Sequence, residues 1–128
     1  MSYDVSMRSP HASECSPDHG EFYHLAYPCP LGWAKVGSPT TNLADMFRLA
    51  FSSDDEPKKY GLRDFDGMLG RKAYLILIGA ISRMKARPDD FRALNPPNGW
   101  GTYEGAVEFL ERLARACEEL PDWTIVVT

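Results

Sequence analysis

The chain has 128 residues, enough for one domain with a modest hydrophobic core but too few for two. Apolar residues make up 44% and charged residues 25%, and the net charge of −4 comes without a basic cluster, which argues against nucleic-acid binding. No apolar run is long enough to span a membrane, no signal peptide is recognisable, and the three cysteines are an odd number for a disulfide framework. We therefore expect residues 1–128 to form a single compact cytoplasmic domain, with no membrane or nucleic-acid partner.

Residues 1–40 are expected to be rich in strands and loops. Tyr3, Val5 and Met7 alternate with polar residues, a period of two that is typical of a half-buried strand. A second strand is predicted over Glu21–Tyr27, which is rich in aromatic residues and ends at a proline. A further short strand is expected around Trp33–Val36.

From residue 41 onward, the chain is predicted to be helical up to a last strand. The first helix begins at a cap supplied by Thr41 or Asn42, whose short side chains accept hydrogen bonds from free helix amides, and ends near Ser52. The second helix covers Arg71–Arg87, and its wide apolar stripe predicts that it is the central, most buried helix. Its predicted buried face consists of Tyr74, Leu77, Ile78, Ile81 and Met84, with Leu75 and Ile76 beside it.

The C-terminal part is predicted to hold a third helix and the last strand. Pro88 ends the second helix and starts a short helical turn that includes Phe91–Leu94. Thr102 caps the third helix, whose apolar stripe includes Cys117, and Trp123–Thr128 has the β-branched composition of a strand. We therefore predict an α+β fold of order β-β-α-α-α-β, with three helices packed on one face of a small three- or four-stranded sheet.

The loop Asn95–Tyr103 departs furthest from what folding alone requires. It combines two prolines, two glycines, two asparagines, a tryptophan and a tyrosine immediately before a helix. The glycines let another group approach the backbone, and the free amides of the following helix favour an anion. Trp100 and Tyr103 offer rings that would stack on a planar group such as a base. The candidate ligand-binding residues are Asn95, Asn98, Gly99, Trp100, Gly101, Thr102 and Tyr103, with Asn42 as a helper.

A structural role for the same loop stays open. In that interpretation Trp100 seats the loop on the hydrophobic core, while the asparagines and glycines form turns. The spacing is not that of a phosphate-binding P-loop, because the lysine and the hydroxyl ligand of magnesium are both absent.

Two sequence motifs occur in the part of the chain from residue 38 to residue 128. The segment Phe91–Gly105 contains Asn-Pro-Pro-Asn-Gly-Trp-Gly-Thr-Tyr, and an Asn-Leu-x-x-Met helix start lies at Asn42–Met46. With these motifs the chain resembles a family of small proteins from bacteria and their phages. The resemblance implies one compact domain in a bacterial or phage context and supplies no catalytic residues.

A group of histidines and cysteines near the N-terminus is a candidate zinc site. It consists of His11, Cys15, His19, His24 and Cys29, and four such ligands would close a tetrahedral site. Their spacings match no standard zinc finger or ribbon, so the alternative is a set of solvated loop residues with a packed Cys29. We favour the alternative and expect no cofactor.

Other charged residues are weaker candidates. Asp64 and Asp66 resemble a metal or phosphotransfer motif only superficially, because the Asp-Gly pair at 66–67 is typical of a turn. Basic residues of the connector would assist an anionic ligand if it folded over the loop, and otherwise lie on the surface. They are Lys58, Lys59, Arg63, Arg71 and Lys72.

These patterns favour binding over catalysis. No nucleophile, base and orienting group can be assembled from the sequence, so an enzyme is the least favoured interpretation. We expect a non-catalytic protein that captures a small anionic or nucleotide-like molecule at Asn95–Tyr103, which in a phage would serve as a counter-defence factor. The alternative is an interaction module or inhibitor that binds a host protein directly, with Tyr23, Tyr27, Trp33 and Trp100 as aromatic anchors.

Overall fold

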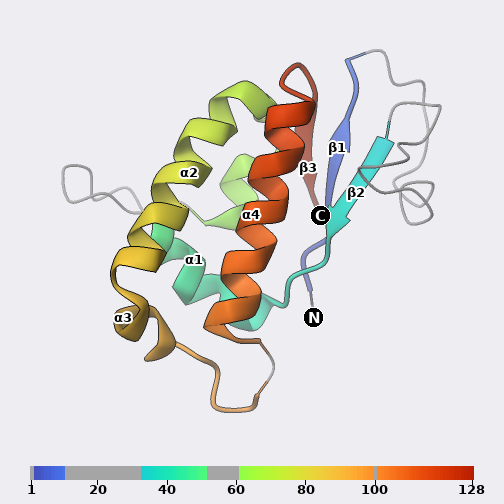
Figure 1. The fold of residues 1–128 in the computed structure, drawn as a ribbon. Coiled ribbons are helices and arrows are strands. Elements are labelled where there is room, and N and C mark those ends of the chain that lie inside the picture. The colour runs from blue at the N-terminus through green and yellow to red at the C-terminus, as the bar shows by residue number, and fades with distance from the viewer. Residues whose placement is uncertain (1, 11–32, 52–60, 100) are drawn as a thin grey trace.

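The computed structural model of the chain describes residues 2–10, 33–51, 61–99 and 101–128 (Figure 1). The strand predicted at Glu21–Tyr27, the cysteine and histidine group, Lys58, Lys59 and Trp100 lie outside the described residues. The predictions made for them stay predictions.

Three short strands form one antiparallel sheet in the described part of the chain. They are β1 (Val5–Arg8), β2 (Trp33–Gly37) and β3 (Thr124–Val127), in the order β2-β1-β3. Met7 in the central strand lies opposite Ala34 of β2 and Ile125 of β3, and all three side chains are buried. The last strand pairs with the first, and β2 corresponds to the short strand expected around Trp33.

The free edge of β3 is covered by residues 66–68. Three hydrogen bonds join the two segments: Gly67 amide to Ile125 carbonyl (2.7 Å), Ile125 amide to Met68 carbonyl (2.9 Å) and Val127 amide to Asp66 carboxylate (2.9 Å). Because unpaired strand edges recruit other chains, this cover protects the sheet. The prediction of a turn at Asp66-Gly67 agrees with the positive φ of Gly67, +82°.

The described residues contain four α-helices and two 3-10 turns. The helices are α1 (Ala44–Phe51), α2 (Gly70–Ala86), α3 (Pro88–Arg92) and α4 (Tyr103–Glu119), while the turns η2 (Thr41–Leu43) and η3 (Leu62–Phe65) precede α1 and α2. The predicted order with three helices is therefore wrong. Pro88 at the first helical position, with Asp89 and Asp90 in the first turn, stabilises the short helix α3 where only a turn was expected.

The cap of the first helix lies earlier than predicted. Thr40, rather than Thr41 or Asn42, has the extended backbone of a cap, and its hydroxyl oxygen accepts from the amide of Asn42 (3.3 Å). Thr41 and Asn42 already belong to the 3-10 turn, so they cannot fill this role.

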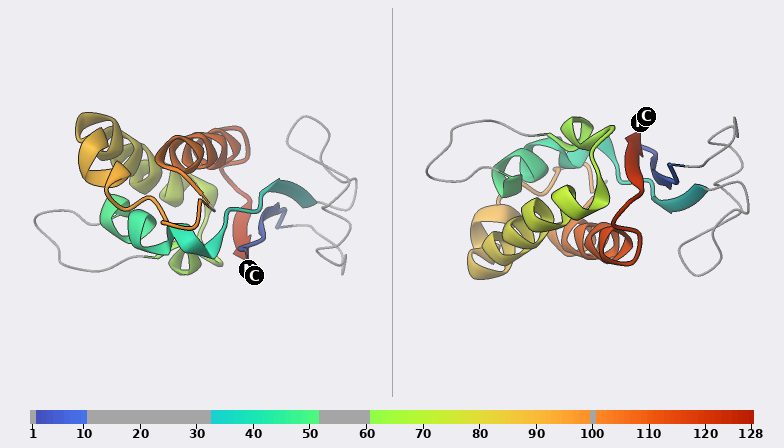
Figure 2. Two further views of the ribbon diagram at one scale, coloured as in Figure 1. Left: turned by 90° about the horizontal axis from the view of Figure 1, so that it is seen from below. Right: turned by 90° about the horizontal axis from the view of Figure 1, so that it is seen from above.

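Helix α4 is the central helix, and it runs between α2 and the strands (Figures 1 and 2). Its buried residues are Tyr103, Ala106, Phe109, Leu110, Leu113, Ala114, Ala116 and Cys117. Helix α2 buries a narrower face of Gly70, Ala73, Leu77, Ala80 and Met84. Leu75 is 68% exposed and Ile78 is 41% exposed, so the prediction that this is the most buried helix is wrong. The small residues of this face lie beside Leu77 and Met84 and allow α2 to pack closely.

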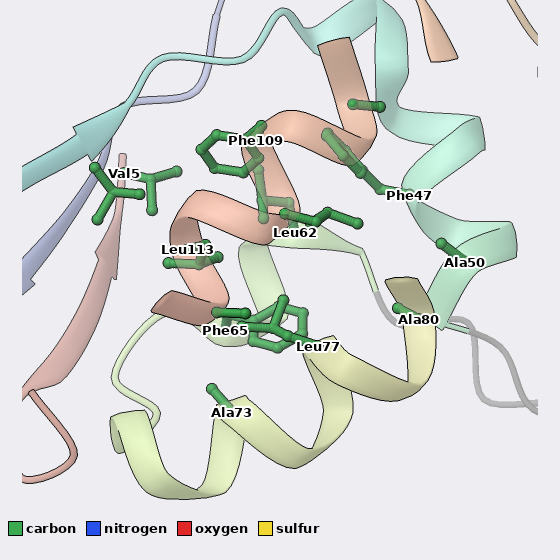
Figure 3. Close-up of a cluster of buried hydrophobic side chains, with 14 of the residues drawn as sticks. Val5, Phe47, Ala50, Leu62, Phe65, Ala73, Leu77, Ala80, Phe109 and Leu113 are labelled. Carbon is green, nitrogen blue, oxygen red and sulfur yellow. The ribbon is translucent and has the colours of Figure 1, made fainter. Parts of the chain in front are cut away.

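One hydrophobic cluster links the sheet, the helices and η3 (Figure 3). The rings of Phe47 on α1 and Phe109 on α4 have centroids 6.1 Å apart, and Phe65 of η3 is fully buried. Within the described residues, none of the helices combines the length and apolar character that crossing a bilayer requires.

Candidate functional site

The first and last residues of the predicted loop hold it against α4. The side-chain oxygen of Asn95 accepts a hydrogen bond from the amide of Tyr103 (2.8 Å). The hydroxyl of Tyr103 donates to the carbonyl of Met84 (2.9 Å), and the residue as a whole is 7% exposed. Phe91 lies beside that ring, with centroids 6.4 Å apart. Tyr103 is therefore a packing residue, and its ring is not open for stacking on a ligand.

The N-terminus of α4 is capped by groups of the protein itself. The hydroxyl oxygen of Thr102 accepts from the amide of Gly105 (3.1 Å), as predicted for a cap. The carboxylate of Glu104 accepts from its own backbone amide and from Arg92, and both contacts hold the pKa of Glu104 below its usual value. With Asn95 occupying the amide of Tyr103, an anion at this helix end would have to displace protein groups. The expectation of free amides here is corrected.

The two glycines of the loop differ in their surroundings. Both have a positive φ, +76° at Gly99 and +110° at Gly101. A Cβ at Gly101 would lie 2.8 Å from the methyl carbon of Thr40 and 3.0 Å from Leu43, whereas a Cβ at Gly99 would meet nothing within 4 Å. Gly101 thus allows the loop to touch the start of the first helix. Asn98 lies in the exposed part of the loop.

A groove of about 420 Å³ opens where the loop meets η2. It is lined by Ser38, Pro39, Thr40, Leu43, Gly101, Thr102, Gly105, Glu108, Phe109 and Arg112. We call it the cap groove, because both helix-capping threonines, Thr40 and Thr102, line it. Among the predicted site residues, Gly101 and Thr102 belong to its lining, and Asn42 reaches it indirectly, because its side-chain amide nitrogen donates to the hydroxyl oxygen of Thr40 (3.1 Å).

The cap groove has an apolar part and a polar part. Leu43 and Phe109 are core residues that contribute apolar surface. The polar part includes Ser38, whose hydroxyl donates to the carboxylate of Asp4 (2.9 Å), and the two capping threonines. Such a mixture is typical of sites that bind small molecules, in which a few polar groups orient a largely apolar contact.

Arg112 is the cation of the cap groove. Its Nη1 lies 3.4 Å from the carbonyl oxygen of Val36, and its Nη2 lies 3.4 Å from a carboxylate oxygen of Glu108. Both contacts are at the long limit of hydrogen bonding. Because a guanidinium has five N–H donors, Arg112 retains donors for a further partner.

The sequence did not single out Arg112. It is one of two arginines on α4 that pair with a glutamate four residues away, Arg112 with Glu108 and Arg115 with Glu119. Nothing in the local sequence distinguishes the two pairs. Arg112 is identified as a groove residue only by the packing of β2 against α4, which brings Val36 to it. Thr40 and Ser38 were missed as well, although a polar turn before a helix is a usable signal for a cap.

The basic residues expected to assist the loop lie elsewhere where the structure describes them. The guanidinium of Arg63 lies 5.3 Å from the ring centroid of Tyr3, and Arg71 pairs with Asp122. Neither they nor Lys72 line the cap groove. Of the two alternatives, assistance to the loop does not hold for these three residues, and they lie on the surface instead, because η3 and the start of α2 lie against β3.

The described residues offer no assembled catalytic or metal centre. Cys117 is buried on α4, and desolvation raises the pKa of its thiol to about 12, which makes it unreactive at neutral pH. Asp64 and Asp66 accept from the backbone amides of Gly61 (2.6 Å) and Val127 (2.9 Å). No group of three or more potential metal ligands occurs in this part of the chain.

In comparisons with known proteins, no family model, no curated protein and no solved structure matches this chain. The resemblance to small bacterial and phage proteins therefore stays a prediction, and the function has to be argued from the cap groove itself.

Proposed function

We propose that the protein binds, without chemical conversion, a small anionic molecule in the cap groove. The observation that carries this proposal is the arrangement of Arg112, which lines the groove and, among the described residues, makes two long contacts to protein oxygens. A phosphate or carboxylate would take the remaining guanidinium donors as charge-assisted hydrogen bonds, which are shorter and stronger than the two present contacts.

The apolar part of the groove supports a ligand with a planar or apolar body. The half-buried Pro39 lines this part together with the buried Leu43 and Phe109, and the hydroxyls of Thr40 and Thr102 provide polar contacts beside them. The volume of about 420 Å³ falls in the range of roughly 300–1,000 Å³ common for small-molecule sites. A nucleotide-like molecule combines both parts. Given the resemblance to phage proteins, capture of such a molecule would remove a host defence signal.

Glu108 sets a limit on the affinity for anions. Its carboxylate lines the same groove and shares Arg112, so an incoming anion meets an attractive and a repulsive charge together. Replacing Glu108 should therefore tighten the binding of an anion, while replacing Arg112 should abolish it.

Thermal unfolding in the presence of nucleoside mono- and triphosphates, cyclic nucleotides and inorganic phosphate tests the proposal. A ligand that binds only the folded state at 100 times its Kd stabilises it by about 2.7 kcal/mol, which is readily detected. We expect a stabilising compound whose effect disappears in Arg112→Gln and increases in Glu108→Gln.

Arg115→Gln is the matched control, because Arg115 forms the same kind of pair on α4 outside the groove. Loss of the effect in Arg115→Gln as well would point to a general charge effect. If none of these compounds stabilises the protein, capture of an anion in the groove is wrong.

A further inference from the structure

Helix α2 presents an exposed face with the spacing of a helix-packing seam. Arg71, Leu75, Ile78, Ser82 and Lys85 are all exposed and follow one another at intervals of 4, 3, 4 and 3 residues. This is the spacing at which one helix contacts another in a left-handed coiled coil. The two aliphatic residues occupy the middle of the seam, where Leu75 is 68% exposed.

The opposite face of α2 is buried in the hydrophobic core. Ala73, Leu77 and Ala80 point into the core, as Figure 3 shows, and α4 packs against that side. The seam therefore faces away from the rest of the described structure, and folding alone gives no reason for two aliphatic side chains there.

The charge of α2 restricts what can cover this face. The charged residues of α2, and Arg87 that follows it, are all basic: Arg71, Lys72, Arg83, Lys85 and Arg87. The chain as a whole has a net charge of −4, so the basic character is local to this helix. Lys72 and Arg87 form no ion pair with any described residue.

The two ends of the seam are held only weakly by the protein. Arg71 pairs with Asp122, and Lys85 pairs with Glu111 (2.8 Å). Both pairs are largely exposed to solvent, and exposed ion pairs contribute little to stability. These cations can therefore be shared with an incoming carboxylate.

We propose that the outer face of α2 binds an acidic amphipathic helix of a partner protein. Apolar residues of the partner would cover Leu75 and Ile78, and its carboxylates would lie near Lys72 and near the two cations at the ends of the seam. Gly79 beside the seam carries no side chain, which lets the backbone of a second helix come close.

Other occupants fit this face less well. In an antiparallel pair of two copies, Arg71 of each copy would meet Lys85 of the other, and like charges disfavour that contact. A membrane surface would require a wider apolar face than two aliphatic residues followed by Ser82. A nucleic acid would leave Leu75 without an apolar partner.

The test measures binding of the full chain to a labelled synthetic peptide of three heptads, with leucine at the seam positions and glutamate beside them. Fluorescence anisotropy should detect binding that Leu75→Ala weakens at least tenfold and that Lys72→Gln weakens severalfold. Leu49→Ala is the matched control, because Leu49 is an exposed leucine on α1, and it should leave the Kd unchanged. Circular dichroism should give equal melting temperatures for Leu75→Ala and the parent protein.

Four results would overturn the proposal. The first is no binding of the acidic peptide, and the second is equal binding of a matched peptide with lysine in place of glutamate. The third is a dimer in analytical ultracentrifugation that Leu75→Ala abolishes, which would assign the face to a second copy. The fourth is binding to vesicles of phosphatidylserine and phosphatidylcholine that depends on Leu75, which would assign it to a membrane.

Discussion

The two long helices of the protein have the same length and opposite roles. Both α2 and α4 have 17 residues, yet α4 buries eight of them and α2 buries five. The apolar residues of α4 form one stripe, and that stripe lies in the core. The apolar residues of α2 spread around the helix, and its large side chains Leu75 and Ile78 stay at the surface. The difference shows that the position of a helix among its neighbours, and not its apolar content, determines what it buries.

The two helices also begin in different ways. The first amides of α4 are satisfied locally by the side chains of Asn95 and Thr102. At the start of α2, the amides of Gly70 and Arg71 donate to the carbonyls of Trp123 (2.8 Å) and Pro121 (3.0 Å), far away in sequence. Helix α4 can therefore start from its own sequence, whereas α2 depends on the folded chain end.

The largest effect is expected from leucine truncation on the two helices. Leu110→Ala on α4 should lower the free energy of unfolding by about 2–5 kcal/mol, because it leaves a cavity in the core. Leu75→Ala on α2 should change it by less than about 0.5 kcal/mol, since the side chain is exposed. Urea denaturation measures both values. Similar losses in the two variants would break the comparison, because they would mean that Leu75 is buried in solution.

Two glycines of α2 provide an intermediate effect. In Gly70→Ala the new Cβ would lie 2.7 Å from the carbonyl oxygen of Leu120, so we expect a loss of about 1–3 kcal/mol from overpacking. In Gly79→Ala the nearest atom is Nη1 of Arg83 at 3.6 Å, so the better helix propensity of alanine should stabilise the protein by about 0.5–1 kcal/mol. Chemical denaturation of both variants gives the sign. A gain in Gly70→Ala would contradict the tight docking of α2 on the chain end.

The smallest effect concerns the two helix starts. Thr102→Ala should destabilise the protein by about 1 kcal/mol, and Thr102→Ser should restore most of it, because serine keeps the capping oxygen. Leu69→Ser at the start of α2 should gain nothing, since the amides that a serine would cap already donate to Pro121 and to the Leu69 carbonyl. Melting temperatures measure all three. Stabilisation by Leu69→Ser would show that the first amides of α2 lack partners, and the two helices would then not differ in how they begin.

Much of the fold was predictable because its signals are local. The alternation around Val5, the capping threonine Thr102 and the apolar stripe of α4 each follow from a few neighbouring residues. The short helix α3 was underestimated, although Pro88 and the two aspartates that start it are visible in the sequence. The buried face of α2 could not be predicted, because small and large apolar residues compete for the core and the partner helix decides between them.

The candidate site was predicted only in part, for the same reason. The loop Asn95–Tyr103 supplies Gly101 and Thr102 to the cap groove, but Tyr103 faces the core and the helix amides are already capped. Arg112 could not be distinguished from Arg115 without knowing where β2 ends. A residue in a groove is defined by what lies opposite it, and that information is not in its local sequence.

Sequence by itself determined where most helices and strands begin and end, because periodicity, caps and turn residues act over a few neighbouring positions. Only the tertiary structure decided which face of α2 stays exposed, which arginine reaches the groove, and how Gly101 meets Thr40. These features depend on contacts between segments distant in the chain, and such contacts form when the whole core packs together.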